Sequence, residues 1–325
     1  MISEKENSTG FIQRLKKYKA LSPILSFGKK YVYNIYIRAR LSADNVPSEV
    51  WIENTNMCNA RCIMCPREKQ TRKSGFMDIK LYEKLIKEIS KHKGKVNRVH
   101  MHNYGEPLLD KYLVKRIKLA KDHGIKYTYF VTNASLLTPD KSRQLIEAGL
   151  DEFKVSFYGT DSATYNETMK GLDFEKTFNN LKDFFRIRKE MGRKAPRVIL
   201  QYLPLETNKF RIKEFIFLMK SLINESIGDS LNIFALHNYG DGRSYLKPGK
   251  ITGICRYPWR TTVILHDGRV VLCCLDYNGV QVVGDVNKNT IEEIWNSERY
   301  KQVRENFKSL RYGNYPICKD CTVII

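Results

Sequence analysis

The stretch that decides the fold is Met57-Cys58-Asn59-Ala60-Arg61-Cys62-Ile63-Met64-Cys65-Pro66. Its three cysteines have the spacing C-x3-C-x2-C, which places three thiols on one short loop. Three thiolates on such a loop can bind three irons of a [4Fe-4S] cluster and leave the fourth iron open to another ligand. The alternatives are a zinc site, which normally takes four protein ligands, and cysteines that are simply buried. The spacing favours the cluster.

Strand and helix patterns alternate from the segment just before this loop onward. The apolar residues 50–54 predict a first strand, so the cysteines follow its carboxyl end, where α/β barrels carry their chemistry. Further strands are predicted at 96–102, 126–132, 152–157, 197–203 and 231–236, with helices at 81–91, 113–123, 139–148, 174–191 and 209–222. These six β/α units imply a parallel sheet with right-handed crossovers.

The cysteine loop at a strand end resembles the AdoMet radical (radical SAM) superfamily. In that superfamily, S-adenosylmethionine binds the open iron and is cleaved reductively to a 5′-deoxyadenosyl radical. Six β/α units are too few for a closed eight-fold barrel, and they are similar to the partial (β/α)6 TIM-like barrel of these enzymes. The resemblance therefore implies an α/β fold that is open on one side, where a large substrate gains access.

A turn after the second predicted strand, residues 104–107, resembles the superfamily's G-G-E-P element, with Tyr104 in place of the first glycine. In the superfamily the backbone of this element meets the amino group of AdoMet. Polar residues at later strand ends resemble contacts to the AdoMet carboxylate and ribose, and their alternative role is strand capping. The resemblance thus implies a cofactor-binding set of Met64, Gly105, Glu106, Pro107, Asn133, Ser156 and Gln201.

The region from residue 246 to 325 predicts a small α+β domain. An Asp-Gly pair at 267–268, between apolar runs, predicts a β-hairpin. Thr290 followed by Glu293 predicts a helix that opens with a capping box.

This region resembles the SPASM/twitch extension of many AdoMet radical enzymes, in which a hairpin and a helix hold an auxiliary iron–sulfur cluster. The resemblance implies an auxiliary [4Fe-4S] cluster with the ligands Cys255, Cys273, Cys318 and Cys321, and leaves Cys274 for packing. A zinc ribbon with four cysteines is the alternative. Five cysteines are too few for the two auxiliary clusters of a full SPASM domain, so the shorter twitch form is expected.

The formal net charge of +21 is unevenly distributed along the chain. Between Gly10 and Ser42 stand eight lysines and arginines and no acidic residue, interleaved with apolar residues. This pattern predicts a basic amphipathic leader over 1–48, ahead of an AdoMet radical core over 49–245 and the auxiliary domain over 246–325. The leader either packs on the barrel or binds an anionic membrane surface. No nucleic acid is expected as a partner, because no recognised module accompanies the charge.

Neither a signal peptide nor a run of roughly 20 apolar residues is present. A cytoplasmic protein is therefore expected, peripheral at the inner face of the membrane if the leader binds there.

The resemblance implies an AdoMet radical oxidoreductase supplied by a flavodoxin- or ferredoxin-type electron donor. The expected function is redox modification, by dehydrogenation or epimerisation, of a sugar, cyclitol or similar small or lipid-linked substrate. Two alternatives stand beside it: a maturase that modifies a peptide or partner enzyme, and a non-catalytic iron–sulfur electron carrier. No residue is identified as a catalytic acid or base. Polar residues expected near the cavity are His102, Asn103, Tyr158, His237, Asn238 and Tyr239.

Overall fold

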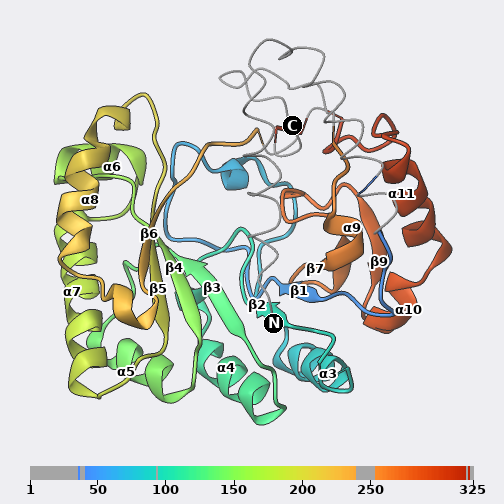
Figure 1. The fold of residues 1–325 in the computed structure, drawn as a ribbon, viewed down its shortest axis with the longest axis horizontal. Helices are drawn as coiled ribbons and strands as arrows, with labels where there is room; N and C mark the ends of the chain where they lie inside the picture. Colours follow the sequence, from blue (N-terminus) through green and yellow to red (C-terminus); the bar gives the residue numbers. More distant parts are fainter. Residues whose placement is uncertain (1–35, 37–40, 93, 239–252, 320, 323–325) are drawn as a thin grey trace.

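The computed structural model describes residues 36, 41–92, 94–238, 253–319 and 321–322 (Figure 1). Most of the predicted leader, the predicted boundary at 245–246 and Tyr239 lie outside these residues. In chain order the elements are β1 (Glu49–Ile52), η2 (Pro66–Lys69), α3 (Ile79–Ser90), β2 (Arg98–His100), η3 (Pro107–Leu109), α4 (Leu113–Asp122), β3 (Thr128–Thr132), α5 (Pro139–Glu147), β4 (Glu152–Ser156), α6 (Ser162–Thr168), α7 (Phe174–Glu190), β5 (Arg197–Tyr202), η4 (Lys209–Arg211), α8 (Ile212–Lys220), η5 (Glu225–Ile227), β6 (Ser230–Ile233), α9 (Tyr257–Arg260), β7 (Thr261–Ile264), β8 (Arg269–Val271), β9 (Val282–Asp285), α10 (Ile291–Trp295) and α11 (Glu298–Lys308).

The strands of the described residues form one sheet in the order β6-β5-β4-β3-β2-β1-β7-β8-β9. Strands β1 to β6 are parallel neighbours in chain order, which confirms the predicted β/α units. Strand β7 lies parallel to β1, with Val50 opposite Thr262, while β8 and β9 are antiparallel additions. The C-terminal region therefore continues the core sheet beyond β1.

The helices α3, α4, α5, α7 and α8 lie along the convex side of the curved sheet, and α9 to α11 lie beyond β7 (Figure 1). Side chains alternate between the two faces of a strand, so one set from each strand meets the helices. Val50, Ile52 and Phe153 belong to this set, and Phe153 contacts the ring of Phe184 on α7 at 4.8 Å. Burying each such side chain contributes about 1.5–3 kcal/mol. The other set faces the concave side.

Helix boundaries follow local sequence signals. The Asp173 side chain accepts a hydrogen bond from the backbone of Lys176 at the start of α7, and Gly192, with a φ of 63°, follows its end. Helix α10 opens with the predicted capping box, in which Thr290 and Glu293 bond each other's backbone. These signals fix where the chain leaves each helix.

The predicted hairpin is confirmed as β7 and β8, with Gly268 in its turn at a φ of 93°. The helices α6, α9 and α11 and the strand β9 were not expected from the sequence. All but α11 have too few residues to show a periodic pattern, and β9 pairs with β8 across an irregularity at Val270 and Val271. Within the described part of the chain, none of the helices has the length and apolar character needed to cross a membrane.

Candidate active site and cluster-binding loops

The cysteines of the first loop, Cys58, Cys62 and Cys65, are half-buried and lie together after β1. Burial raises the pKa of Cys58 to about 11, and nearby Glu106 raises it further. The pKa of Cys62 is raised first by burial and then by the charges of Cys65 and Cys58, so the three thiols are close neighbours. Thiols in this environment stay protonated until a metal replaces the proton.

The backbone of this loop is fixed by the segment that follows α6. Arg61 donates its backbone N–H to the Lys170 carbonyl at 2.7 Å, and Ile63 donates to the Thr168 carbonyl at 3.1 Å. Gly171 has a φ of 89°, and a Cβ there would lie 3.2 Å from the Asn59 carbonyl. The end of α6 and the residues that follow it therefore hold the backbone of the cysteine loop.

The Gly105-Glu106 turn packs directly against the same loop. The Glu106 backbone donates to the Met57 carbonyl at 2.8 Å. A Cβ at Gly105 would lie only 2.2 Å from the Thr55 carbonyl oxygen, a distance that no side chain tolerates. Glycine is therefore required here because two backbones meet. The predicted contact of residues 105–107 with AdoMet stays a prediction.

The Glu106 side chain joins the ends of β2 and β3. Its carboxylate accepts hydrogen bonds from the Leu108 backbone at 3.0 Å, the Thr132 hydroxyl at 2.6 Å and the Asn133 backbone at 2.7 Å. Burial raises the pKa of Glu106 to about 7, although these donors pull it down. The side chain thus stabilises the fold around the site, whereas the sequence had suggested only a ligand contact.

Asn133 lies beside the cysteine loop, as its predicted role requires. Its amide nitrogen is 2.9 Å from the Asn59 side-chain oxygen and 4.0 Å from the Cys58 sulfur. The next residue, Ala134, is buried with a φ of 59°, a conformation that is costly for a residue other than glycine. Asn180 of α7 donates to the Ala134 carbonyl at 3.0 Å and helps to hold this turn.

The remaining predicted AdoMet contacts divide into two kinds. Ser156 and Gln201 are opposite each other in the β4–β5 register and are half-buried. The Tyr158 hydroxyl donates to the Ser156 hydroxyl at 2.9 Å. Met64 is buried within the main hydrophobic core, and its predicted contact with AdoMet stays a prediction. The carboxyl ends of β3, β4 and β5 therefore carry Asn133, Ser156 and Gln201 along one edge of the sheet.

The four predicted auxiliary ligands also lie together. Burial raises the pKa of Cys255 to about 12, with further contributions from Cys273 and Cys321. The pKa of Cys318 is raised by burial and then by Cys273, Cys255 and Cys321. Cys255 and Cys318 therefore both sense the charges of Cys273 and Cys321, which brings together residues from before α9, from the end of β8 and from the C-terminal segment.

Cys274 is a direct neighbour of Cys273, since the two side chains hydrogen-bond each other, and its predicted packing role stays a prediction. It packs against Val263, Leu265 and Val271, a small second core on β7 and β8. Its sulfur is 4.0 Å from the Tyr257 hydroxyl.

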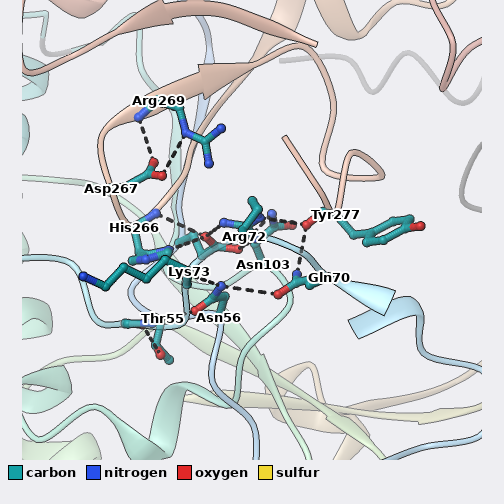
Figure 2. A network of polar contacts seen from close by, with 12 residues as sticks. Thr55, Asn56, Gln70, Arg72, Lys73, Asn103, His266, Asp267, Arg269 and Tyr277 are labelled. Atoms are coloured by element: carbon teal, nitrogen blue, oxygen red, sulfur yellow. Dashed lines mark hydrogen bonds and ion pairs between the residues drawn. The ribbon is translucent and has the colours of Figure 1, made fainter. Parts of the chain in front are cut away.

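A buried ion pair connects the two cysteine regions (Figure 2). Arg72, which follows the first cysteine loop, donates to both carboxylate oxygens of Glu53 at 2.8 Å. Glu53 also accepts from the His266 backbone at 3.1 Å and from Asn103 at 3.3 Å. Although burial alone would raise it, the pKa of Glu53 is held at about 2 by hydrogen bonds from His266 and Arg72. Sequence reasoning missed this network, because Glu53 and Arg72 belong to no motif.

The same arginine reaches the loop that follows Cys273. Its Nε donates to the Tyr277 carbonyl at 2.8 Å, and the Gln70 amide donates to that carbonyl at 2.9 Å. Asn278 accepts from the Thr71 backbone at 2.8 Å. The segment 70–72 therefore holds the loop of an auxiliary ligand in a fixed position relative to the first cysteine loop.

The donor atoms bear on the kind of metal centre. Both cysteine groups offer only thiols, the donors that iron–sulfur clusters take. The first group has three cysteines, one fewer than the four protein ligands that a structural zinc ion normally takes. The donor set thus fits a cluster at each position.

Comparison with known families agrees with this chemistry. The family model described as "Radical SAM superfamily" matches residues 52–191, and the model described as "Iron-sulfur cluster-binding domain" (SPASM) matches residues 255–322. The chain belongs to the radical SAM superfamily. It carries a C-terminal SPASM domain, and with these domains come an AdoMet-binding [4Fe-4S] cluster and an auxiliary iron–sulfur cluster.

Relatives of this radical SAM protein have several activities. An S-adenosyl-L-methionine-dependent 2-deoxy-scyllo-inosamine dehydrogenase of Niallia circulans is 23% identical, over 86% of this chain and 94% of the relative. A tungsten-containing aldehyde ferredoxin oxidoreductase cofactor-modifying protein of Pyrococcus furiosus is 22% identical, over 84% and 87%. A PqqA peptide cyclase of Bradyrhizobium diazoefficiens is 31% identical, over 38% and 32%.

Solved structures confirm the fold class. BtrN in complex with AdoMet and 2-DOIA superposes with a TM-score of 0.62 at 21% identity, covering 86% of this chain and 94% of that one. SuiB of Streptococcus suis bound to S-adenosylmethionine also gives a TM-score of 0.62, at 16% identity, covering 97% and 82%. The radical SAM core is therefore a partial barrel with a small C-terminal iron–sulfur domain, as predicted.

Proposed function

We propose that this radical SAM enzyme oxidises an alcohol on a small hydroxylated ring, a sugar or a cyclitol, to a ketone. The observation that carries the proposal is the placement of the two cysteine groups. The first follows the carboxyl end of β1, and residues 70–72, which come soon after it, bond to the loop that follows Cys273. A substrate bound beside both groups would have a hydrogen-abstracting site at the first and an electron acceptor at the second.

The atoms and electrons that leave the substrate define what the protein must supply. Oxidation of a secondary alcohol to a ketone removes one hydrogen atom from carbon, one proton from oxygen and one electron. When bound, AdoMet and the two clusters supply hydrogen-atom abstraction and acceptance of the electron. The chain's own residues bind the ring, exclude water and accept the proton.

The residues at the carboxyl ends of the strands suit the AdoMet end of this site. Asn133, Ser156 and Gln201 offer neutral hydrogen-bonding groups on β3, β4 and β5, and Asn133 is beside the cysteine loop. We assign these three to AdoMet, together with the backbone of residues 105–107. The dehydrogenase of Niallia circulans, which aligns over most of both chains, supports the reaction type.

The test is anaerobic incubation of the reconstituted enzyme with AdoMet, dithionite and a panel of cyclitols, hexoses and aminocyclitols. Formation of 5′-deoxyadenosine with an equal amount of ketone supports the proposal. A product that keeps the substrate's mass but has inverted one carbon would instead indicate epimerisation. Absence of ketone from every hydroxylated ring, with AdoMet still cleaved, would overturn it.

Peptide modification is the second candidate, because a PqqA peptide cyclase is among the similar proteins. It is tested in the same system with cell peptides in place of sugars, followed by mass spectrometry for a loss of two hydrogens. An electron carrier without catalysis would fail to cleave AdoMet at all.

For partners and location, we infer a flavodoxin- or ferredoxin-type electron donor, and a cytoplasmic enzyme that the basic leader attaches to anionic lipid at the inner face of the membrane. The leader's charge supports the second inference, since each basic side chain near such a surface contributes up to about 1 kcal/mol. A lipid-linked saccharide substrate would suit that location.

A further inference from the structure

Four aromatic side chains form a compact cluster on the concave face of the sheet: Trp51, His100, His102 and Tyr129. Trp51, His100 and Tyr129 are opposite one another in the register of β1, β2 and β3. Trp51 and His100 are stacked with ring centroids 4.1 Å apart, and Tyr129 meets the edge of His100 at 4.4 Å. His102, two residues along the same face, is 4.8 Å from Trp51 and 5.2 Å from Tyr129. We call this group the lumen cluster.

The lumen cluster faces away from the helices. Its strand neighbours Val50, Ile52, Val99 and Phe130 are fully buried in the core beneath the helices, so alternation directs the cluster to the other face. Trp51 also packs on the second core that holds Cys274. The cluster therefore lies on the face of the sheet opposite the helices, beside the β7–β8 core against which Cys274 packs.

Three polar atoms of the cluster have no partner. The Nδ1 atoms of His100 and His102 and the indole Nε1 of Trp51 are buried and make no hydrogen bond within the described residues. His100 and His102 are only 3% and 6% exposed. Buried polar groups are almost always paired in folded proteins, so three unpaired atoms in one cluster indicate partners that this structure does not hold, either water or a ligand that displaces it.

The hydrogen atoms carried by these ring nitrogens define which groups a ligand must offer. His100 Nε2 is 3.1 Å from a carboxylate oxygen of Glu49, which can only accept, so Nε2 carries the hydrogen and Nδ1 is an acceptor. Trp51 Nε1 is only a donor. Burial lowers the pKa of both histidines, to about 4 for His100, so their side chains are neutral at pH 7, while Arg98 and Lys154 lie over the Tyr129 ring at 5.5 and 5.2 Å.

A ligand that offers both a donor and an acceptor, without charge, fits these groups. A hydroxyl does both with one oxygen, whereas a carboxylate or phosphate leaves the His100 acceptor unpaired. We propose that Trp51, His100 and His102 bind hydroxyl groups of the substrate ring, with one hydroxyl donating to His100 Nδ1 and one accepting from Trp51 Nε1. The inference rests on the proposed function and names the residues that recognise its substrate.

Two substitutions each remove one side-chain atom that is proposed to hydrogen-bond the substrate. Trp51→Phe keeps an aromatic ring for the stack and deletes the indole donor. His100→Gln keeps an N–H for Glu49 in the place of Nε2 and deletes the Nδ1 acceptor. His92→Gln is the matched control, since His92 follows α3 and pairs with Glu292 at 3.5 Å, away from the sheet.

The experiment measures binding without turnover. Reconstituted enzyme with AdoMet and no reductant is titrated calorimetrically with 2-deoxy-scyllo-inosamine, scyllo-inositol and inositol monophosphate as probes. Trp51→Phe and His100→Gln should each weaken binding of the best neutral ring at least tenfold, with iron content and AdoMet affinity unchanged. His92→Gln should bind as the wild type does. If His100→Gln fails to fold, Trp51→Phe alone decides.

The outcomes separate this inference from the proposed function. If the wild type oxidises a hydroxylated ring and both variants bind it with wild-type affinity, the lumen cluster is not the binding site, although the proposed function holds. If only the phosphorylated probe binds, the ligand chemistry assigned here is wrong. A wild type that neither binds nor oxidises any hydroxylated ring overturns both.

Discussion

Arg72 donates its Nε hydrogen to the carbonyl of Tyr277 at 2.8 Å, across 205 residues of chain. The other two nitrogens of the same guanidinium bind both oxygens of the buried Glu53 at 2.8 Å. One side chain thereby connects the segment that follows the AdoMet-cluster cysteines with the loop that follows Cys273. The relative position of the two cluster sites depends on the contacts of this guanidinium group.

Arg72→Met should destabilise the protein by about 3–5 kcal/mol, because it leaves the Glu53 carboxylate buried without its partner. The measurement is anaerobic chemical denaturation of the reconstituted enzyme. Arg72→Lys should recover only part of the loss, since a lysine cannot replace the two-pronged contact. The control is Arg269→Met, whose partner Asp267 is largely at the surface and whose loss should cost less than about 1 kcal/mol. Equal effects at both arginines would contradict the assignment.

Anaerobically reconstituted wild-type protein should contain about eight irons and eight sulfides, as two four-iron clusters require. Replacing Cys58, Cys62 and Cys65 together by alanine should halve the iron content and abolish 5′-deoxyadenosine formation. Iron and sulfide assays with absorbance near 400 nm report the first, and chromatography the second. Unchanged iron content in the triple variant would contradict the assignment of these three cysteines as cluster ligands.

Cys273→Ala and Cys274→Ala should differ, because it is Cys273 whose charge raises the pKa of both Cys255 and Cys318. Loss of Cys273 should remove or damage the auxiliary cluster, whereas Cys274→Ala should keep it and lose only packing, by about 1 kcal/mol. Electron paramagnetic resonance of the reduced proteins separates the two clusters. The reverse outcome would mean that the chain after β8 is shifted by one residue.

The histidines of the lumen cluster should stay neutral well below the usual pKa of histidine. Since burial lowers the pKa of His100 from 6.5 to about 4, the folded protein binds fewer protons than the unfolded chain between these values. The stability contributed by this difference is fully present above pH 6.5 and is lost as the pH falls toward 4. In ¹⁵N-histidine spectra, the signals that disappear in His100→Gln and His102→Gln should not titrate between pH 8 and 5.5. Titration near 6.5 would show that the cluster is open to water.

The basic leader should confer binding to anionic vesicles that weakens as salt rises, because its attraction is electrostatic. A variant that begins near Pro47 should stay in the supernatant of a sedimentation assay and keep both clusters. A zwitterionic vesicle is the control. If the truncation causes aggregation or loss of iron, the leader packs on the barrel and does not anchor the protein.

Sequence alone determined those parts of the protein whose signals are local. The C-x3-C-x2-C loop, the six β/α units, the Asp-Gly hairpin and the Thr290 capping box depend on residues a few positions apart, and each was found where expected. Short elements such as β9 and α6 were not predicted, because a segment of four to seven residues is too short to show a hydrophobic period.

Tertiary structure decided what depends on distant residues meeting. No spacing in the chain relates Glu53 and Arg72 to Tyr277, or assigns the Glu106 carboxylate to Thr132 and Asn133. The pairing of β7 with β1 is of the same kind, since a strand's partner is set by the sheet that remains open to it. The role inferred for the histidines of the lumen cluster also depends on the tertiary structure. In the sequence, His102 is an ordinary residue at a strand end. Only in the assembled sheet do four rings from three parallel strands pack together and bury polar atoms without partners among the described residues.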